Sequence, residues 1–534
     1  MLIFIPILLL IFGSIAITII YRLKSRIGLT WLIAAGSTFF AWLILVYLRF
    51  FLPTDVPLID WTPSNLFYAS PSLMIDYVSW PYAMALLTIE IAYIFTDSAR
   101  AKDIVNPMSW AGSMAITAIG LMALLAGNPL TMVLAWALVD IIEFVYLISI
   151  QQNNRWNRQI IILFALRVLS LIIFSWATMV GWLDVGQFDI DDIPNRSGVY
   201  FLIAGAIRLG VFSINTSFFK DLYERRGSGI LLRLAPIASS LGLIARMPPE
   251  TFTIRPYWVM PIQIMIGLVV FITALIWLLK ENLYEASHYW YISLAAMAII
   301  CAINGQAQFS RSWGLALLLS GSLLMLFDPP IRRLRFLLIP GLLGMVALPY
   351  TMASSGWPGI FGQGISFLSI TALISHSLLI AGFMKFLLTG KGLTTNLESW
   401  SKISFPIGLI FIIQTQIALG IVGWPGVLSA DFWWAGMVGL LLAITLLFVG
   451  NKLRNSPVNL EIRRKVIANQ RIHNFFRFLN SFFSLTWVKS IFLRTYQAAG
   501  NLVLTVTRFI EGDSAILWAF VIIILLLSFL RIGD

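Results

Sequence analysis

The chain has 534 residues, of which 59% are hydrophobic and only 11% are charged. A soluble protein carries roughly 25% charged residues, so this composition excludes an ordinary soluble domain. Apolar runs of about 18–24 residues recur from end to end, and each can cross a bilayer as a helix. We therefore predict an all-α polytopic membrane protein, because a β-barrel would show shorter segments of alternating polarity.

In chain order, the apolar runs predict sixteen membrane spans, near residues 2–21, 29–52, 77–96, 109–126, 129–150, 159–182, 198–215, 229–246, 258–279, 289–304, 312–327, 334–351, 366–389, 403–423, 432–450 and 515–530. Most of the 36 Lys and Arg residues fall in the connections that follow odd-numbered spans. By the positive-inside rule these connections face the cytoplasm. We expect both chain ends outside, in a bacterial inner membrane, and the net charge of +12 reflects topology, not nucleic-acid binding.

Residues 452–512 interrupt this pattern, because they carry many basic residues and lie between the last two spans. Their apolar residues recur at roughly helical spacing, which predicts an amphipathic helix along the cytoplasmic surface. Such a helix either adsorbs to the membrane surface or braces other helices of the chain, and the sequence leaves both open.

Cofactor-binding patterns are absent from the sequence. The chain has one cysteine, Cys301, and three histidines, without a CxxC or HxxxH pair and without a glycine-rich phosphate loop. We expect no metal, haem, flavin or nucleotide in this chain. If it takes part in an enzyme, it acts at most as a translocase subunit without its own redox centre.

Two acids interrupt the apolar fifth span, in the stretch "LAWALVDIIEFVYLIS" at residues 134–149. Asp140 and Glu143 are three residues apart, so they occupy neighbouring positions on one helix face. Ionisable residues at membrane depth are costly and often mark ion pathways. The alternative is a structural ion pair with Arg167 or Arg208, which lie within other spans. Glu90, in the third span, is isolated and expected to pair with a surface Lys or Arg.

Four motifs resemble the antiporter-like subunits of proton-translocating NADH:quinone oxidoreductase (complex I) and of Mrp-type Na⁺/H⁺ antiporters. These are "SPSLMIDYVSWPYAMALL" at 70–87, Trp136 in the fifth span, "GAIRLGVFSINTSFF" at 205–219 and "LLRLAPIASSLGLIAR" at 231–246. The layout of sixteen spans, with a lateral helix before the last, is similar to the longest of these subunits.

The resemblance implies a domain organisation and a set of partners. Helices 1–108 would precede two inverted five-helix bundles, at 109–250 and 251–390, each with a broken helix. Spans within 391–451, the lateral helix at 452–512 and a last span within 513–534 would follow. The partners would be the other membrane subunits of one complex and lipid, and not nucleic acid.

The chain departs from the family pattern at the residues that relay protons. The family glutamate after Trp136 is Ala137 here, and the acids stand further along the helix. Arg208 and Arg233 replace family Lys and His residues, and arginine does not release its proton in proteins. In the second bundle, Gln363 stands near the family lysine position, and the proline-glycine break near Pro349 is kept.

The late ionisable residues are His376, expected as a core histidine, and Lys385, expected to extend toward the cytoplasm. The candidates for an ion pathway are therefore Asp140, Glu143, Arg167, Arg208, Arg233, His376 and Lys385. Three interpretations remain open: an ion-translocating subunit of a redox-driven complex, a non-conducting scaffold with the same fold, or a membrane subunit of a Mrp-type antiporter or inorganic-carbon uptake complex.

Overall fold

The computed structural model describes residues 2–24, 27–58, 69–97, 107–150, 154–212, 228–251, 256–327, 332–362, 364–389, 401–429 and 431–454, and positions 494, 497, 501 and 521–524. The chain divides into two compact units, Met1–Asn459 and Leu460–Asp534. The amphipathic helix predicted at 452–512 and the last predicted span lie almost entirely outside the described residues. The account below concerns the first unit.

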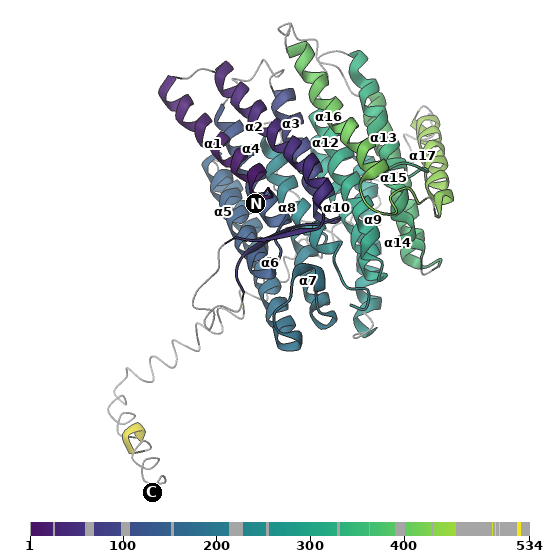
Figure 1. Ribbon diagram of the computed structural model, residues 1–534. Coiled ribbons are helices and arrows are strands. Elements are labelled where there is room, and N and C mark those ends of the chain that lie inside the picture. The colour runs from purple at the N-terminus through teal and green to yellow at the C-terminus, as the bar shows by residue number, and fades with distance from the viewer. Residues whose placement is uncertain are drawn as a thin grey trace. The chain divides into compact units, whose positions relative to one another are not determined.

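Helices make up nearly all of this unit (Figure 1). Those of the N-terminal half are α1 (Phe4–Lys24), α2 (Ile27–Leu48), α3 (Ser79–Asp97), α4 (Pro107–Leu124), α5 (Pro129–Ile150), α6 (Asn154–Val185), α7 (Asn195–Arg208) and α8 (Ser228–Ile244). Those that follow are α9 (Pro256–Leu279), α10 (Leu283–Ile303), α11 (Ser310–Leu315), α12 (Gly321–Leu326), α13 (Leu338–Val346), α14 (Trp357–Phe361), α15 (Phe367–Thr389), α16 (Ser401–Val422) and α17 (Trp433–Arg454).

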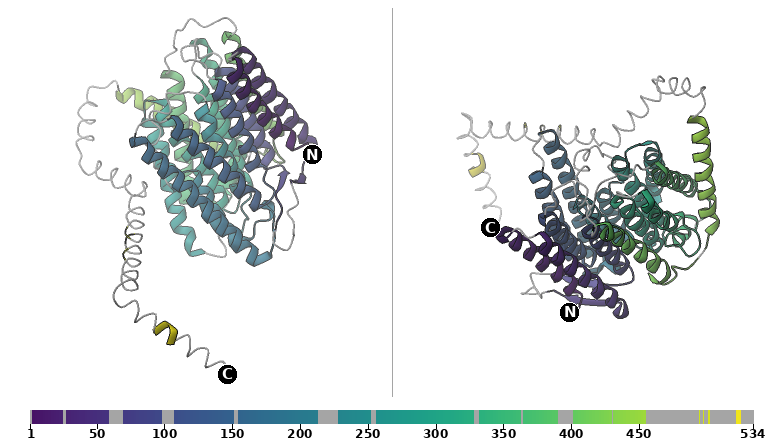
Figure 2. Two further views of the ribbon diagram at one scale, coloured as in Figure 1. Left: turned by 90° about the vertical axis from the view of Figure 1, so that its left-hand side faces the viewer. Right: turned by 90° about the horizontal axis from the view of Figure 1, so that it is seen from above.

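Ten helices in the described part of the chain are long and apolar enough to cross a membrane. Almost every residue of α3 and α10 is buried, whereas α1 and α6 expose many large apolar side chains. A helix that is apolar all round is buried among other helices, so α3 and α10 form the interior. Figure 2 shows the helices from the side and end-on. The prediction of an all-α polytopic membrane protein is confirmed, with one two-stranded hairpin added.

Two helices end inside their predicted spans. The span predicted at 198–215 begins as α7 but stops at Arg208, where the amides of Gly210 and Val211 donate to the carbonyls of Ile207 and Ala206 at 3.0 and 2.9 Å. Gly210 has φ +78°, which suits glycine and ends a right-handed helix. The prediction of a helix was therefore wrong for residues 209–212. Residues 213–215 lie outside the described part of the chain.

The second interruption is the one predicted near Pro349. Helix α13 ends at Val346, and Ala347 and Tyr350 have φ of 60° and 65°. The chain then passes through short turns into α14. The prediction of a broken helix here is confirmed. A different interruption, a π-helical turn at Ala316–Ser320, joins α11 to α12.

The hairpin consists of β1 (Thr54–Pro57) and β2 (Ser72–Ile75), which pair antiparallel. The Met74 amide donates to the Leu125 carbonyl at 2.7 Å, and the Gly127 amide donates to the Ser72 carbonyl at 3.0 Å. A Cβ at Gly127 would lie 2.5 Å from the Ser72 hydroxyl, so only glycine permits this approach. The hairpin thus lies against the connection between α4 and α5.

Connections that follow even-numbered predicted spans meet at this same end of the helices. Arg246, after α8, donates to Asp76 at 2.8 Å and to Asp191, after α6, at 2.6 Å. Arg311, at the start of α11, donates to the Tyr77 carbonyl at 3.1 Å, and Arg49, after α2, donates to the Val422 carbonyl at the end of α16 at 2.7 Å. These contacts join the connections after α2, α6, α8 and α16 and the start of α11.

Asp76 holds this end together and explains the motif "SPSLMIDYVSW". Its Oδ1 accepts hydrogen bonds from the amide of Ser79 at 2.7 Å and from the Ser79 hydroxyl at 2.5 Å, which caps the start of α3. The Trp80 indole donates to the Leu45 carbonyl at 2.8 Å. Burial raises the pKa of Asp76, but Arg246 and the Ser79 hydrogen bonds outweigh burial and hold this pKa below its usual value. Burial raises the pKa of Asp191, and its repulsion from Asp76 adds to this.

The Asp76–Arg246 pair should make stability depend on pH in the acid range. A lowered folded pKa means that the pair stabilises the chain above the unfolded value of ~3.9 and is lost as pH falls through the folded value. We expect Asp76→Asn to cost about 3 kcal/mol at neutral pH, near the lower end for a broken buried pair, because Asp191 still binds Arg246. Unfolding temperatures in detergent should show the difference between variant and wild type narrowing at acid pH. An equal difference at every pH would contradict the assignment.

Candidate functional site

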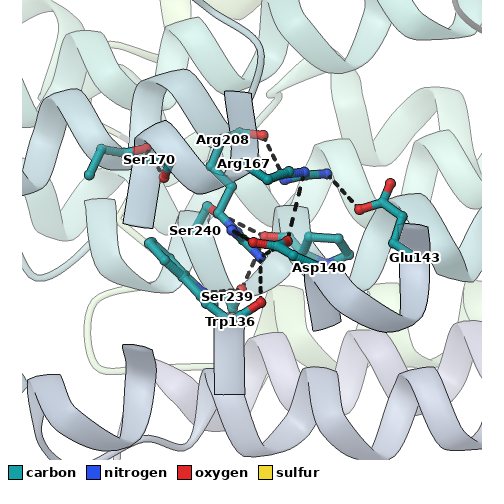
Figure 3. A network of polar contacts seen from close by, with 10 residues as sticks. Trp136, Asp140, Glu143, Arg167, Ser170, Arg208, Ser239 and Ser240 are labelled. Carbon is teal, nitrogen blue, oxygen red and sulfur yellow. Dashed lines mark hydrogen bonds and ion pairs between the residues drawn. The ribbon is translucent and has the colours of Figure 1, made fainter. Parts of the chain in front are cut away.

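Four of the ionisable residues predicted in the first bundle meet between the three helices α5, α6 and α7 (Figure 3). Asp140 and Glu143 come from α5, Arg167 from α6 and Arg208 from α7. All four are buried, with 2–8% of each residue exposed. We call these four residues the acid–arginine cluster. It has two acids and two arginines, so it is neutral when all four are ionised.

Asp140 and Arg208 form a bidentate ion pair. Arg208 Nη2 donates to Asp140 Oδ1 at 2.6 Å, and Nη1 donates to Oδ2 at 2.8 Å. The two parallel bonds match the planar guanidinium to the planar carboxylate, which is the strongest arrangement of these groups. The predicted contact between Asp140 and Arg208 is confirmed. At 0% and 1% side-chain exposure, neither charge can obtain compensation from water.

Arg167 links the other members of the cluster. Its Nη2 lies 3.4 Å from Glu143 Oε2, its Nε lies 4.0 Å from Asp140 Oδ1, and its Nη1 donates to the Arg208 carbonyl at 3.1 Å. Arg208 is the last residue of α7, so its carbonyl oxygen has no amide partner within the helix. The early end of α7 is therefore part of the site, because it supplies an acceptor for Arg167.

Trp136 supports the pair from one turn before Asp140. Arg208 Cζ lies 4.4 Å from the centroid of the Trp136 ring, within the range of a cation–π contact. The Trp136 indole donates to the Ser239 hydroxyl of α8 at 2.9 Å, and Ser239 donates to the Pro236 carbonyl at 3.0 Å. The tryptophan of the fifth-span motif thus fixes Arg208 against α8. The sequence of α8 did not indicate that Ser239 would contact Trp136.

The two acids are held very differently. Asp140 receives two short hydrogen bonds from Arg208, whereas Glu143 Oε2 is buried without a hydrogen bond among the described residues. Its contact with Arg167 is electrostatic and longer. Asp140 is thus locked, and Glu143 keeps lone pairs that can accept a proton. Spacing along α5 could not distinguish these two roles.

The other predicted candidates, Arg233, His376 and Lys385, are not members of the acid–arginine cluster. The Arg233 guanidinium of α8 lies 5.7 Å from the ring centroid of Tyr291 on α10, and the Tyr291 hydroxyl bonds the sulfur of Met325. Arg233 thus extends toward the helices that follow α9. Nearby on α10 is His288, a histidine that the sequence analysis did not select, whose buried Nε2 has no hydrogen-bond partner among the described residues.

His376 is buried at the broken helix. Its Nε2 lies 2.9 Å from the Met345 carbonyl, and its ring packs between Trp313 and Trp357 with centroid distances of 5.5 and 5.1 Å. A carbonyl only accepts, so Nε2 carries the hydrogen. The helical partner of this carbonyl would be Pro349, which has no amide hydrogen. The prediction of a core histidine is confirmed, and its role is to satisfy the end of α13.

Lys385 satisfies another helix end. Its Nζ donates to the carbonyls of Leu278 and Lys280 at 2.9 and 2.8 Å, at the last turn of α9. The side chain is partly exposed and reaches the end of a helix, as a lysine that extends from the apolar region does. A part for His376 and Lys385 in an ion pathway stays a prediction.

One prediction about a carboxylate was wrong. Glu90 does not pair with a Lys or Arg in the described part of the chain but is fully buried against α4, where the hydroxyls of Ser113 and Thr117 lie 2.8 and 2.9 Å from its carboxyl oxygens. The cause is tertiary: α3 is surrounded by other helices along its whole length, so its middle is not near a surface.

Removing one member of the bidentate pair should destabilise the whole bundle. We expect Asp140→Ala to lower the free energy of unfolding by ~3–5 kcal/mol, because Arg208 is left charged and buried without its carboxylate. The double variant Asp140→Ala/Arg208→Met should recover most of this loss, since it removes both charges. The unfolding temperature and the yield of monodisperse protein in detergent measure both effects. If the double variant is as unstable as Asp140→Ala, the pair does not hold the bundle together.

Comparison with known proteins identifies the fold. No family model and no curated protein matches this sequence. Among solved structures, a chain of the Mrp complex from Dietzia sp. DQ12-45-1b matches with a TM-score of 0.72 and 15% identity, over 100% of this chain and 63% of that one. This chain therefore spans less than two thirds of the Mrp chain.

Two further structures agree. A chain of the membrane-bound sulfane sulfur reductase, an archaeal respiratory membrane complex, matches at TM-score 0.66 and 15% identity, over 99% and 100% of the two chains. A chain of respiratory complex I from Thermus thermophilus matches at 0.57 and 13%, over 78% and 98%. Because a Mrp complex and a complex I both occur here, the resemblance of the four motifs is confirmed for the fold: this chain has the fold of the antiporter-like membrane subunits.

Proposed function

We propose that this chain is a membrane subunit of a multisubunit complex of the complex I or Mrp kind, and that it moves protons or cations through the acid–arginine cluster. The observation that carries this proposal is the contrast between the two acids. A locked Asp140–Arg208 pair lies beside Glu143, which is buried with one oxygen that accepts no hydrogen bond from the described residues.

The chemistry of the cluster assigns the exchangeable proton to Glu143. Arginine stays charged, so Arg167 and Arg208 can change the charge state of a neighbour but cannot pass on a proton themselves. A proton on Glu143 would cancel its attraction to Arg167, whose Nε is already 4.0 Å from Asp140. Arg167 would then shift its ion pair toward Asp140, and loss of the proton would reverse the shift.

The domain and topology predictions complete this proposal. The bundles would be residues 109–250 and 251–390, the connections after odd-numbered spans would face the cytoplasm of a bacterial cell, and 452–512 would lie along that surface. Redox chemistry, where the complex has it, would belong to partner subunits, and this chain would bind no cofactor.

The second candidate function is a non-conducting scaffold. The observation in its favour is that His376 Nε2 and Lys385 Nζ bind carbonyls at the ends of α13 and α9. A group that has to hold a helix end is a poor relay. On this alternative, the ion pairs would serve assembly, and the complex would carry its ion path elsewhere.

The test compares ion uptake by liposomes that contain the complex purified with its native partners. We expect Glu143→Gln to abolish uptake while the complex still assembles, because the amide keeps the shape and cannot carry a proton. Glu285→Gln, which removes a half-exposed ion pair with Lys280, is the matched control and should leave uptake unchanged. A pH-sensitive dye and radioactive sodium distinguish the two ions. Undiminished uptake in Glu143→Gln would favour the scaffold.

Arg208→Lys provides an independent test of the roles within the cluster. We expect it to assemble and to keep part of the uptake, since a lysine still compensates Asp140 but loses the second parallel hydrogen bond. The measurement is uptake per assembled complex. Complete loss of uptake with intact assembly would show that Arg208 does more than hold Asp140.

A further inference from the structure

Glu90 is an ionisable group that the acid–arginine cluster does not contact. It lies in the middle of α3 and is fully buried. Ser113 and Thr117, four residues apart on one face of α4, lie 2.8 Å from its Oε1 and 2.9 Å from its Oε2. These are its only hydrogen-bond partners in the described part of the chain.

In the part of the chain that the structure describes, no positively charged side chain contacts Glu90. Along the same interface, Asp97 accepts a hydrogen bond from the Trp110 indole at 2.9 Å, and Tyr93 bonds the Ser109 hydroxyl at 3.1 Å. On the other helices that pack against α3, Arg233 of α8 stacks on Tyr291, and Arg311 of α11 bonds Tyr77 beyond the start of α3. An ionised Glu90 would therefore be a buried charge with two neutral donors, which is strongly unfavourable.

The hydrogen bonds around Glu90 fit a protonated carboxyl group. The Ser113 oxygen lies 2.8 Å from Glu90 and also 2.9 Å from the Trp110 carbonyl, but a hydroxyl has a single hydrogen to donate. If Glu90 is protonated, its O–H donates to Ser113, Ser113 donates to Trp110, and Thr117 donates to the other carboxyl oxygen. Each of the three hydrogens then has its own acceptor.

We propose that Glu90, Ser113 and Thr117 form a proton-binding site between α3 and α4, in which Glu90 carries a proton at neutral pH. The site is separate from the acid–arginine cluster and does not depend on the proposed function. It places an exchangeable proton between α3 and α4, where α4 is the first helix of the first predicted bundle.

Infrared difference spectroscopy on the purified full-length protein tests this site. The C=O stretch of a protonated carboxyl group should be present at neutral pH, disappear when the pH is made alkaline, and be absent from Glu90→Gln at both. Thr117→Val keeps the volume and removes the donor to the C=O oxygen, so the band should persist and move to higher frequency. Thr415→Val, which alters a hydroxyl on the other side of α3, should leave the band in place.

Each result decides the question. Loss of the band in Glu90→Gln, or its shift in Thr117→Val if Glu90→Gln does not fold, supports the proposal. A band that is unchanged in both variants would assign the proton to another residue and overturn it. Absence of the band in wild type, with a carboxylate stretch that responds to Na⁺ instead, would show that Glu90 is ionised and overturn it as well.

Discussion

The absence of water at membrane depth is the constraint on which this structure depends. Every polar group there needs a partner within the protein, because an unsatisfied one costs several kcal/mol. Helices meet this need except at their ends, where the last carbonyls have no amide to bind. Three helices end with such carbonyls exposed to the interior, and in each case a basic side chain of another helix binds one: Arg167 at α7, His376 at α13 and Lys385 at α9.

This shared arrangement changes how the buried basic residues are interpreted. A positive side chain at the carboxyl end of a helix also interacts favourably with the helix dipole. Lys385 fits this description, and His376 binds its helix end through Nε2, while its Nδ1 has no partner among the described residues. Arg167 is different, because it binds the end of α7 and lies against both acids of α5 at once. Among the described residues, the need to satisfy a helix end coincides with a pair of ionisable acids only around Arg167.

The two acids of the cluster are held by different arginines. Arg208 binds both oxygens of Asp140, whereas Arg167 makes one longer contact with Glu143, so Glu143 is the acid that keeps an oxygen without a hydrogen bond among the described residues. A second set of ion pairs lies at the hairpin end of the helices, where the Asp191 side chain is exposed. There Arg246 joins Asp76 and Asp191, and through them the hairpin end of α3 is tied to the connections after α8 and α6.

By itself, the sequence determined that the chain crosses a membrane many times, since the length and polarity of apolar runs are local properties. It also determined that Asp140 and Glu143 share a helix face, and the motifs around Trp136 and Asp76 indicated the fold. Tertiary structure decided the rest, because partners far apart in the chain set it. The end of α7 at Arg208, the pairing of Arg208 with Asp140 and not with Glu143, and the burial of Glu90 against Ser113 and Thr117 all depend on which helices pack together, and spacing along one helix does not contain that information.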